Sequence, residues 1–165
     1  MENPNSNKPL KTIFAPLAMA AGLIFFQAYM IAPLIPKLAT IFNVSEQRIG
    51  LIVPAYMLAY GVSVLFYGFI SDKFGRKRIL QISLLAFIVL TAITALVQSA
   101  SQLILLRLLT GLGASGVVPM SLALVGDMFK PSERGRPLGL LFAAMEGGMA
   151  LGSTAGVMLE PYTGW

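Results

Sequence analysis

Five apolar stretches, each about 20 residues long or longer, divide this chain, and short polar connections separate them. A helix needs roughly 20 mostly apolar residues to cross the hydrocarbon core of a bilayer. Hydrophobic residues make up 56% of the sequence and charged residues 12%, whereas a soluble domain has roughly 25% charged residues. The sequence therefore predicts an all-α integral membrane protein with transmembrane helices at about residues 12–35, 49–70, 79–98, 103–128 and 137–160.

The residue types that the sequence lacks exclude several kinds of site. Without cysteine there is no disulfide, thiol nucleophile or cysteine metal ligand, and without histidine there is no imidazole for metal binding or acid-base chemistry. Hydrolytic sites need a histidine, a cysteine or paired acids, and Glu146 alone among the carboxylates lies near the middle of an apolar stretch. We therefore expect no metal, no cofactor and no enzyme activity.

The distribution of basic residues predicts the orientation in the membrane. A net charge of +5 would suggest nucleic acid if the basic residues shared one exposed face, but here they follow the connections between helices. With a cytoplasmic N-terminus, nine of the 12 Lys and Arg residues lie inside and two lie outside, as the positive-inside rule requires of a multi-pass protein of the cell membrane. The inside set is Lys8, Lys11, Lys73, Arg76, Lys77, Arg78, Lys130, Arg134 and Arg136, and the outside set is Lys37 and Arg48.

The most charged part of the chain is the segment 68–80, between the second and third apolar stretches. We expect it to be a short connection in water at a membrane face. Gly68 permits close approach of another backbone, and Gly75 permits the positive φ of a tight turn. Asp72 can pair with the cations beside it or with nearby helix ends. The alternative is a basic loop that only fixes orientation.

The order Gly68-x-x-x-Asp72-x-x-Gly75-Arg76-Lys77 resembles the signature loop between helices 2 and 3 of the major facilitator superfamily of secondary transporters. The resemblance implies that these five residues form a gating latch, which grips a helix of the other half of the protein and stabilises one access state. It also implies a fold of twelve helices in two halves of six, built from inverted three-helix repeats.

The first apolar stretch closes on Pro33 and Pro36, which cannot both sit inside a regular helix and so bend or end it. The same Pro-x-x-Pro ending is found in the drug:proton antiporter branch of the superfamily, where an acidic residue often precedes it. This chain has no such acid, which argues against carrying over a specificity for cationic drugs. Polar side chains on the first two helices are candidates for the substrate cavity, with ordinary helix packing as the alternative: Gln27, Tyr29, Tyr56 and Tyr60.

Arg107 lies about five residues inside the fourth apolar stretch. A charge near the bilayer centre costs at least ~2.5 kcal/mol, so Arg107 needs a partner, water or a path to the interface. The alternative to a functional role is snorkelling to the outer surface. The surrounding residues, including Gly111 and Gly113, resemble the helix 4 motif of the family, whose arginine is implicated in proton coupling; Thr110 stands where the family has glutamine.

Glu146 is placed near the middle of the fifth helix, where a low dielectric disfavours its charged form. Such a carboxylate can load and release protons as water access alternates, and Arg107 is the intramembrane cation available to modulate it. Their expected depths allow coupling through water more readily than direct contact. The alternatives for Glu146 are a substrate ligand or a neutral acid in a packed interface.

Glycines repeat along the fifth helix at Gly148, Gly152 and Gly156, after an earlier Gly139. A glycine every four residues forms a flat stripe for close packing of a partner helix. This spacing resembles the helix 5 motif of antiporters in the superfamily, except that Ser153 and Val157 replace its proline and its last glycine. We expect Gly111 and Gly113 on the fourth helix to serve helix packing as well.

The resemblance covers helices 1 to 5 of the N-terminal half, with helix 6 and the C-terminal half absent from residues 1–165. It implies secondary active transport of a small organic solute, such as a drug or metabolite leaving the cell, coupled to protons by alternating access. The partners would be the lipid bilayer, the solute, protons and the missing C-terminal half. The alternative is a truncated, non-transporting membrane remnant, or a half-subunit that needs a separate partner.

Overall fold

The computed structural model describes the backbone of residues 8–163 and the side chains of residues 14–158, and this part of the chain is helical without a strand. The side chains of Lys8 and Lys11, counted above for topology, fall outside it. Five helical segments are long and apolar enough to cross a membrane: Phe14–Ile41, Glu46–Phe74, Arg76–Thr94, Ala100–Met128 and Gly135–Met158. The elements are α1 (Lys8–Met30), η1 (Ala32–Leu34), α2 (Ile35–Ile41), α3 (Glu46–Gly50), α4 (Ile52–Phe74), α5 (Arg76–Thr94), α6 (Ala100–Ala114), α7 (Val117–Met128), η2 (Pro131–Glu133) and α8 (Gly135–Thr163).

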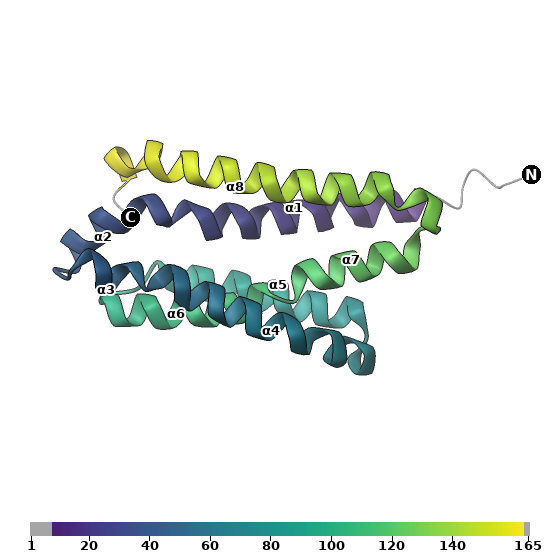
Figure 1. The fold of residues 1–165 in the computed structure, drawn as a ribbon, viewed down its shortest axis with the longest axis horizontal. Helices are drawn as coiled ribbons and strands as arrows, with labels where there is room; N and C mark the ends of the chain where they lie inside the picture. The colour runs from purple at the N-terminus through teal and green to yellow at the C-terminus, as the bar shows by residue number, and fades with distance from the viewer. Residues whose placement is uncertain (1–7, 164–165) are drawn as a thin grey trace, which may run out of the picture.

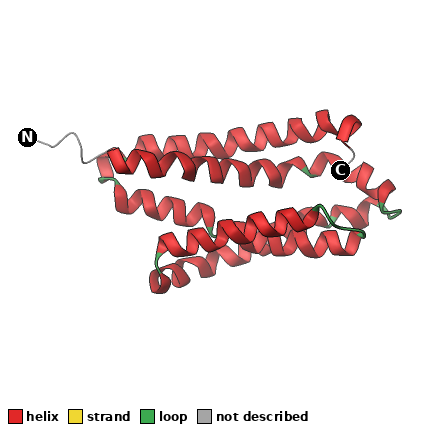
Figure 2. Ribbon diagram, turned by 180° about the vertical axis from the view of Figure 1, so that it is seen from behind, coloured by secondary structure: helices red, strands yellow, loops and turns green. Residues whose placement is uncertain are grey.

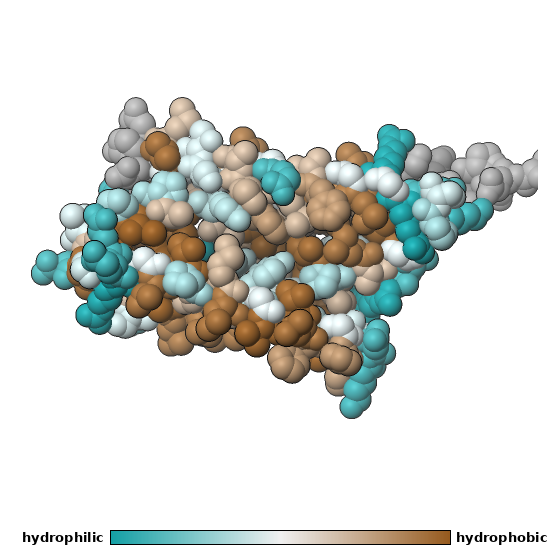
Figure 3. Space-filling model, in the orientation of Figure 1, coloured by the Kyte–Doolittle hydropathy of each residue, from teal (hydrophilic) through white to brown (hydrophobic). Residues whose placement is uncertain are grey.

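The helices form two layers along the long axis of the molecule (Figures 1 and 2). α1 and α8 lie side by side in one layer, and α4, α5 and α6 form the other, with α7 leading back from the second layer towards the first. The start of α1, the α4–α5 turn and the α7–α8 connection share one end of the bundle (Figure 1). On the face shown in Figure 3, polar residues gather at both ends, and apolar residues prevail in the middle, where a few polar residues interrupt them. This distribution suits a bundle that spans a bilayer.

Glycines set the spacing of α1 and α8. A Cβ built on Gly148, Gly152 or Gly156 would overlap the backbone carbonyl oxygen of Gly22, Phe26 or Met30, respectively. Because lipid offers no hydrophobic drive between helices, this close backbone contact lets dispersion forces hold the pair together. The matched order of contacts also shows that α1 and α8 run parallel.

Glycines also set the close packing of α6 against α4 and α5 within the second layer. A Cβ on Gly111 would lie 2.5 Å from the carbonyl oxygen of Tyr56 in α4, and one on Gly113 would lie 3.1 Å from the backbone nitrogen of Phe87 in α5. No described atom beyond its chain neighbours and its own helix backbone lies within 4 Å of a Cβ built on Gly68 or Gly139. Within the described part of the chain, no other helix therefore approaches Gly68 or Gly139 closely, and the close approach expected at Gly68 and the packing role expected for Gly139 stay predictions.

Several helix limits differ from the predicted ones. The connection between the first two predicted helices, 12–35 and 49–70, is shorter than expected, because Pro33 and Pro36 each stand in the first turn of a new helical segment, and helix continues to Ile41. A proline there loses no intrahelical hydrogen bond, so the two residues bend the span and let it resume. The next helix, α3, begins at Glu46, and the side chain of the preceding Ser45 accepts a hydrogen bond from the backbone N–H of Arg48 (3.3 Å).

The segment 68–80 is mostly helical, which corrects the expected loop. α4 runs to Phe74 and α5 begins at Arg76, so the connection is Gly75 alone, with φ of +89°. A side chain at Gly75 would be strained in that conformation, whereas glycine adopts it without a steric penalty. The charged residues around it are therefore held at fixed positions on helix ends.

The fourth span was predicted as one helix over 103–128, but it breaks between α6 and α7. Gly116 lies at the break, where a Cβ would overlap the ring of Tyr67 and the hydroxyl of Ser83. The carbonyl oxygen of Leu112 accepts hydrogen bonds from the hydroxyls of Tyr67 (3.0 Å) and Ser115 (2.8 Å), so side chains satisfy this acceptor where the helix is interrupted.

Candidate functional site

Arg107 is buried at the centre of the bundle, with 1% of its surface exposed. Its Nη1 donates a hydrogen bond to Oε1 of Gln27 (3.0 Å), and its Nη2 donates one to the carbonyl oxygen of Ala28 (3.3 Å). Its Cζ lies 4.5 Å from the ring centroid of Tyr56. Arg107 thus does not snorkel to the surface. The groups of α1 and α4 that contact its guanidinium are neutral.

The close approach of α6 and α4 explains this position. Gly111, one turn after Arg107, packs against the backbone of Tyr56. Two helices in such contact bring the guanidinium onto the Tyr56 ring, where the negative face of the ring attracts it. Nε of Arg107 is buried and has no hydrogen-bond partner in the described chain. A buried donor without an acceptor costs free energy, so the buried guanidinium of Arg107 lowers the stability of the folded protein.

Two stacked aromatic pairs face each other beside Arg107. In α1, Phe25 and Tyr29 lie 6.4 Å apart between ring centroids with an interplanar angle of 12°, and in α4, Tyr56 and Tyr60 lie 6.0 Å apart at 24°. Between the pairs is a slot of about 90 Å³, lined by Phe25, Ala28, Tyr29, Tyr56, Met57 and Tyr60. Met57 is 46% exposed, so the slot opens on the surface of the bundle.

Glu146 is exposed on α8 and makes no hydrogen bond or ion pair with the described residues. Leu140, Ala144 and Leu151 of the same helix line an apolar groove on one side of the α1–α8 pair. Helical spacing places Glu146 on the other side, towards which Phe25 and Tyr29 project from α1. The structure does not bring Glu146 and Arg107 into direct contact.

The register of α1 and α8 fixes the depth of Glu146. Gly148 lies opposite Gly22, so Glu146 is level with about residue 20 of α1. At 1.5 Å rise per residue, it lies about 7 Å along the axis from the level of Phe25 and about 13 Å from that of Tyr29. The carboxylate of Glu146 is therefore closer than the aromatic slot to the end of the bundle that holds the Gly75 turn.

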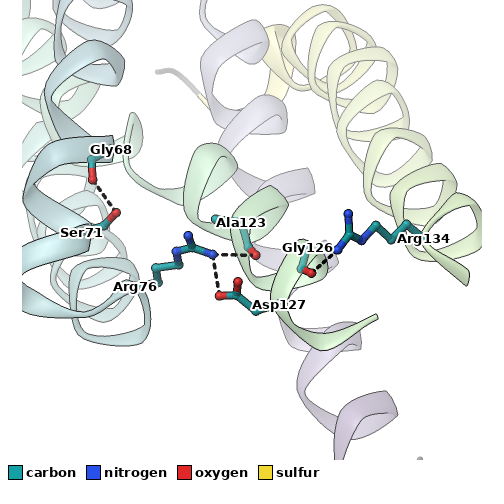
Figure 4. Close-up of polar contacts among 7 residues, drawn as sticks. All are labelled: Gly68, Ser71, Arg76, Ala123, Gly126, Asp127 and Arg134. Carbon is teal, nitrogen blue, oxygen red and sulfur yellow. Dashed lines mark hydrogen bonds and ion pairs between the residues drawn. The ribbon is translucent and has the colours of Figure 1, made fainter. Parts of the chain in front are cut away.

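A separate polar cluster ties α5 to α7 at the end of the bundle that holds the Gly75 turn (Figure 4). Nη1 of Arg76 donates a hydrogen bond to the carbonyl oxygen of Ala123 (3.1 Å) and forms an ion pair with the carboxylate of Asp127. Arg134 donates hydrogen bonds to the carbonyl oxygens of Gly126 (2.6 Å) and Phe129 (3.0 Å), which caps the end of α7.

The remaining residues of the expected latch lie around this cluster. The Ser71 hydroxyl donates a hydrogen bond to the carbonyl oxygen of Gly68 (2.8 Å) within α4 (Figure 4). Asp72 and Lys77 are exposed and form no ion pair with the described part of the chain. Of the five latch residues, Arg76 alone thus bonds through its side chain to another helix of the described chain, and its partners are on α7.

Sequence reasoning had selected Gln27, Tyr56 and Arg107 separately but had not joined them. No spacing rule links residues 27 and 107, which are 80 positions apart. The break at Gly116 and the role of Tyr67 were missed too. The Gly-Ala-Ser-Gly run at 113–116 was a usable signal, because closely spaced glycines weaken a helix.

Comparison with known proteins agrees with this picture. Residues 17–165 match the sequence model of the Major Facilitator Superfamily. The chain is 33% identical over 132 residues to the puromycin resistance protein pur8 of Streptomyces alboniger, covering 79% of this chain and 26% of that protein. It is 28% identical over 121 residues to multidrug resistance protein 3 of Bacillus subtilis, covering 73% and 24%.

A triacylglyceride transporter of Mycobacteroides abscessus is 30% identical over 163 residues, covering 94% of this chain and 31% of that protein. The chain thus spans about a quarter to a third of the length of these curated relatives.

Proposed function

Because this chain belongs to the Major Facilitator Superfamily, a family of multi-pass membrane transporters, we propose that it supplies part of a secondary transporter that moves a small organic solute by alternating access. Two of its relatives are named for drug resistance, so export of a drug or metabolite is the direction we propose. Such transport makes and breaks no covalent bond and needs no cofactor.

Buried Arg107 is the observation that carries this proposal. Its guanidinium links α6 to α1 and α4 in the middle of the membrane-spanning bundle, with neutral partners only among the described residues. A charge in that place is expensive, and proteins keep such charges mainly on substrate and ion pathways. The aromatic slot beside it opens on the surface, as a solute site requires.

We propose Glu146 as the proton carrier. It is a carboxylate in a membrane-spanning helix, on the side of α8 that faces the region of the slot. A carboxylate that moves between a wet and a dry surrounding takes up a proton in the dry one and releases it in the wet one. Arg107 would then act on Glu146 through water or through the solute, since the two residues make no direct contact.

We propose that the C-terminal half of the transporter, which is not part of residues 1–165, packs against the exposed side of Glu146 and binds the five latch residues. Gly68, Asp72, Gly75, Arg76 and Lys77 would grip it at the cytoplasmic surface. We place that surface at the end of the bundle that holds the start of α1 and the Gly75 turn (Figure 1), because most of the basic residues in the connections lie there. Asp72 and Lys77, exposed and without ion pairs in the described chain, are free to make such contacts.

The test is solute transport by the full-length protein in proteoliposomes, with puromycin as the first solute because of the relative named for resistance to it. We expect uptake into inverted vesicles to rise when an outward-directed proton gradient is imposed. Glu146→Gln should abolish this stimulation while leaving movement down the solute's own gradient. Glu133→Gln, which changes an exposed carboxylate in a connection, is the matched control.

Two results would contradict the proposal. Full stimulation by the proton gradient in Glu146→Gln would remove Glu146 from proton coupling. A folded protein without transport of puromycin or of any of a panel of drugs would instead favour the non-transporting remnant, or a half-subunit that acts only with a separate partner.

A further inference from the structure

The aromatic slot differs from a site for organic cations because a positive charge, the guanidinium of Arg107, lies against one of its rings. Its lining residues, Phe25, Ala28, Tyr29, Tyr56, Met57 and Tyr60, include no carboxylate. A cation-binding aromatic site attracts its ligand through the negative faces of its rings. At Tyr56, the guanidinium of Arg107 already lies over the ring, 4.5 Å from its centroid.

Arg107, Tyr56 and Tyr60 form a ladder with the positive charge at its buried end. Arg107 is 1% exposed and Tyr56 is 3% exposed, and Tyr60 stacks on Tyr56 nearer to the surface. A charge with so little water around it is weakly screened, so its field reaches through the two rings into the slot. This field repels an organic cation and attracts an anion or the electron-rich face of a neutral ring.

The shape of the slot sets the second requirement. Stacked rings of α1 form one wall and stacked rings of α4 form the other, so a flat group fits between them better than a branched one. At about 90 Å³, the slot is smaller than the roughly 300–1,000 Å³ of a drug site, so it holds one ring while the rest of the solute lies outside.

From this geometry we infer that the slot between Phe25–Tyr29 and Tyr56–Tyr60 binds the planar aromatic part of the transported solute and prefers neutral or anionic aromatic compounds to organic cations, with Arg107 setting that preference. The inference rests on the proposed transport function and names its class of substrate. Glu146 lies about 7 to 13 Å away along the helix axis, so its carboxylate is not a wall of the slot.

The experiment measures equilibrium binding of three matched probes to the full-length protein in nanodiscs, with binding to empty nanodiscs subtracted. The probes share a naphthalene ring and differ in charge: 2-naphthamide is neutral, 2-naphthoate is an anion and 2-naphthyltrimethylammonium is a cation. We expect the amide and the carboxylate to bind at least about tenfold more tightly than the ammonium compound. Tenfold in affinity corresponds to about 1.4 kcal/mol.

Variants separate the slot from the charge. Tyr60→Ala removes one of the two rings of the α4 wall and should weaken binding of all three probes by about tenfold. Phe66→Ala, which removes an exposed ring of the same helix outside the slot, should change the binding of none of them. Arg107→Met should bring the ratio of amide to ammonium affinity below about threefold. Gln27→Glu should do the same by placing a negative charge against Arg107 while the guanidinium stays, which keeps the test usable if Arg107→Met fails to fold.

Three results would overturn the inference. The ammonium probe binding as tightly as the amide would deny the charge preference, and equal losses in Tyr60→Ala and Phe66→Ala would deny the slot. A preference that survives Gln27→Glu but disappears in Glu146→Gln would assign it to Glu146 in place of Arg107. Because binding is measured without transport, a protein that binds the probes as expected but moves no solute contradicts the proposed function and leaves this inference standing.

Discussion

Arg76 joins α5 to α7, and Arg107 joins α6 to α1 and α4, but the two residues lie in different surroundings. Arg76 lies at a helix end with 35% of its side chain exposed and pairs with the carboxylate of Asp127, itself 55% exposed. Arg107 lies inside the bundle with 1% exposure, and its partners are an amide, a carbonyl and an aromatic ring. The charge of Arg76 is balanced by a carboxylate in contact with water. The charge of Arg107 is buried, and no carboxylate of the described residues balances it.

The difference shows what each residue contributes. An exposed ion pair stabilises a protein by about 0.2–1 kcal/mol and weakens with salt. A buried cation without a carboxylate costs free energy, so its retention is better explained by function than by stability. We therefore expect changes around Arg107 to affect solute binding and transport strongly, and loss of the Arg76–Asp127 ion pair by a change at Asp127 to affect mainly local stability.

The largest effect is expected from Arg107→Lys. Lysine keeps the positive charge but cannot reach Gln27 and Ala28 together through one planar group, nor stack on Tyr56. The initial rate of solute transport in proteoliposomes should fall at least about tenfold, the loss expected when a few kcal/mol of positioning disappears. A rate within twofold of the parent protein would show that a charge at position 107 suffices and that its geometry does not matter.

Gln27→Leu should come next. It leaves Nη1 of Arg107 without its acceptor in a buried place, which costs about 1–3 kcal/mol. Equilibrium unfolding in detergent measures this loss. Asn in place of Gln27 is a conservative comparison that keeps the amide but shortens its reach, and it should lose less. Equal stability of Gln27→Leu and the parent protein would mean that water replaces the amide.

Tyr56 tests the aromatic partner of Arg107. Tyr56→Phe keeps the ring and its contact with the guanidinium, whereas Tyr56→Leu removes both. We expect Tyr56→Leu to be less stable than Tyr56→Phe by about 1–2 kcal/mol, the range for a desolvated cation–π contact. If the two variants unfold at the same denaturant concentration, the ring contributes only its volume.

The smallest effect is expected at the other arginine. Asp127→Asn removes the ion pair with Arg76 and should lower the free energy of unfolding by at most about 1 kcal/mol at low salt, and by less at 1 M salt, where the Debye length is about 3 Å. Asp72→Asn is the matched control, because Asp72 forms no ion pair in the described chain. A larger loss for Asp72→Asn than for Asp127→Asn would reverse this assignment of roles.

Hydrophobic run length and residue type were enough to predict the fold class. Five spans follow from apolar stretches long enough for a bilayer, and the positive φ at Gly75 follows from a glycine between two helical runs. Polarity in an apolar stretch was also enough to select Arg107 and Gln27 as candidates, because intramembrane polar side chains are rare without a partner or a function.

The contacts between distant residues could not be predicted in the same way. The pairing of Gln27 with Arg107 depends on how α1 and α6 are rotated about their axes, which many long-range contacts decide together. The helix break at Gly116 depends on Tyr67 and Ser83 from two other helices. Likewise, the helix continues through Pro36 because this proline stands in the first turn of α2. The length of the apolar stretch does not reveal that position.

Arg107→Met tests most directly whether this arginine is kept for function. Met fills a similar volume without charge, so the gain from removing a buried cation should offset the lost hydrogen bonds to Gln27 and Ala28. Transport per folded molecule and the free energy of unfolding are measured on the same reconstituted preparation. We predict at least about a tenfold loss of transport, with a stability within about 1 kcal/mol of the parent protein. A variant that unfolds far more easily but still transports at the parent rate would contradict this account and make Arg107 a structural residue.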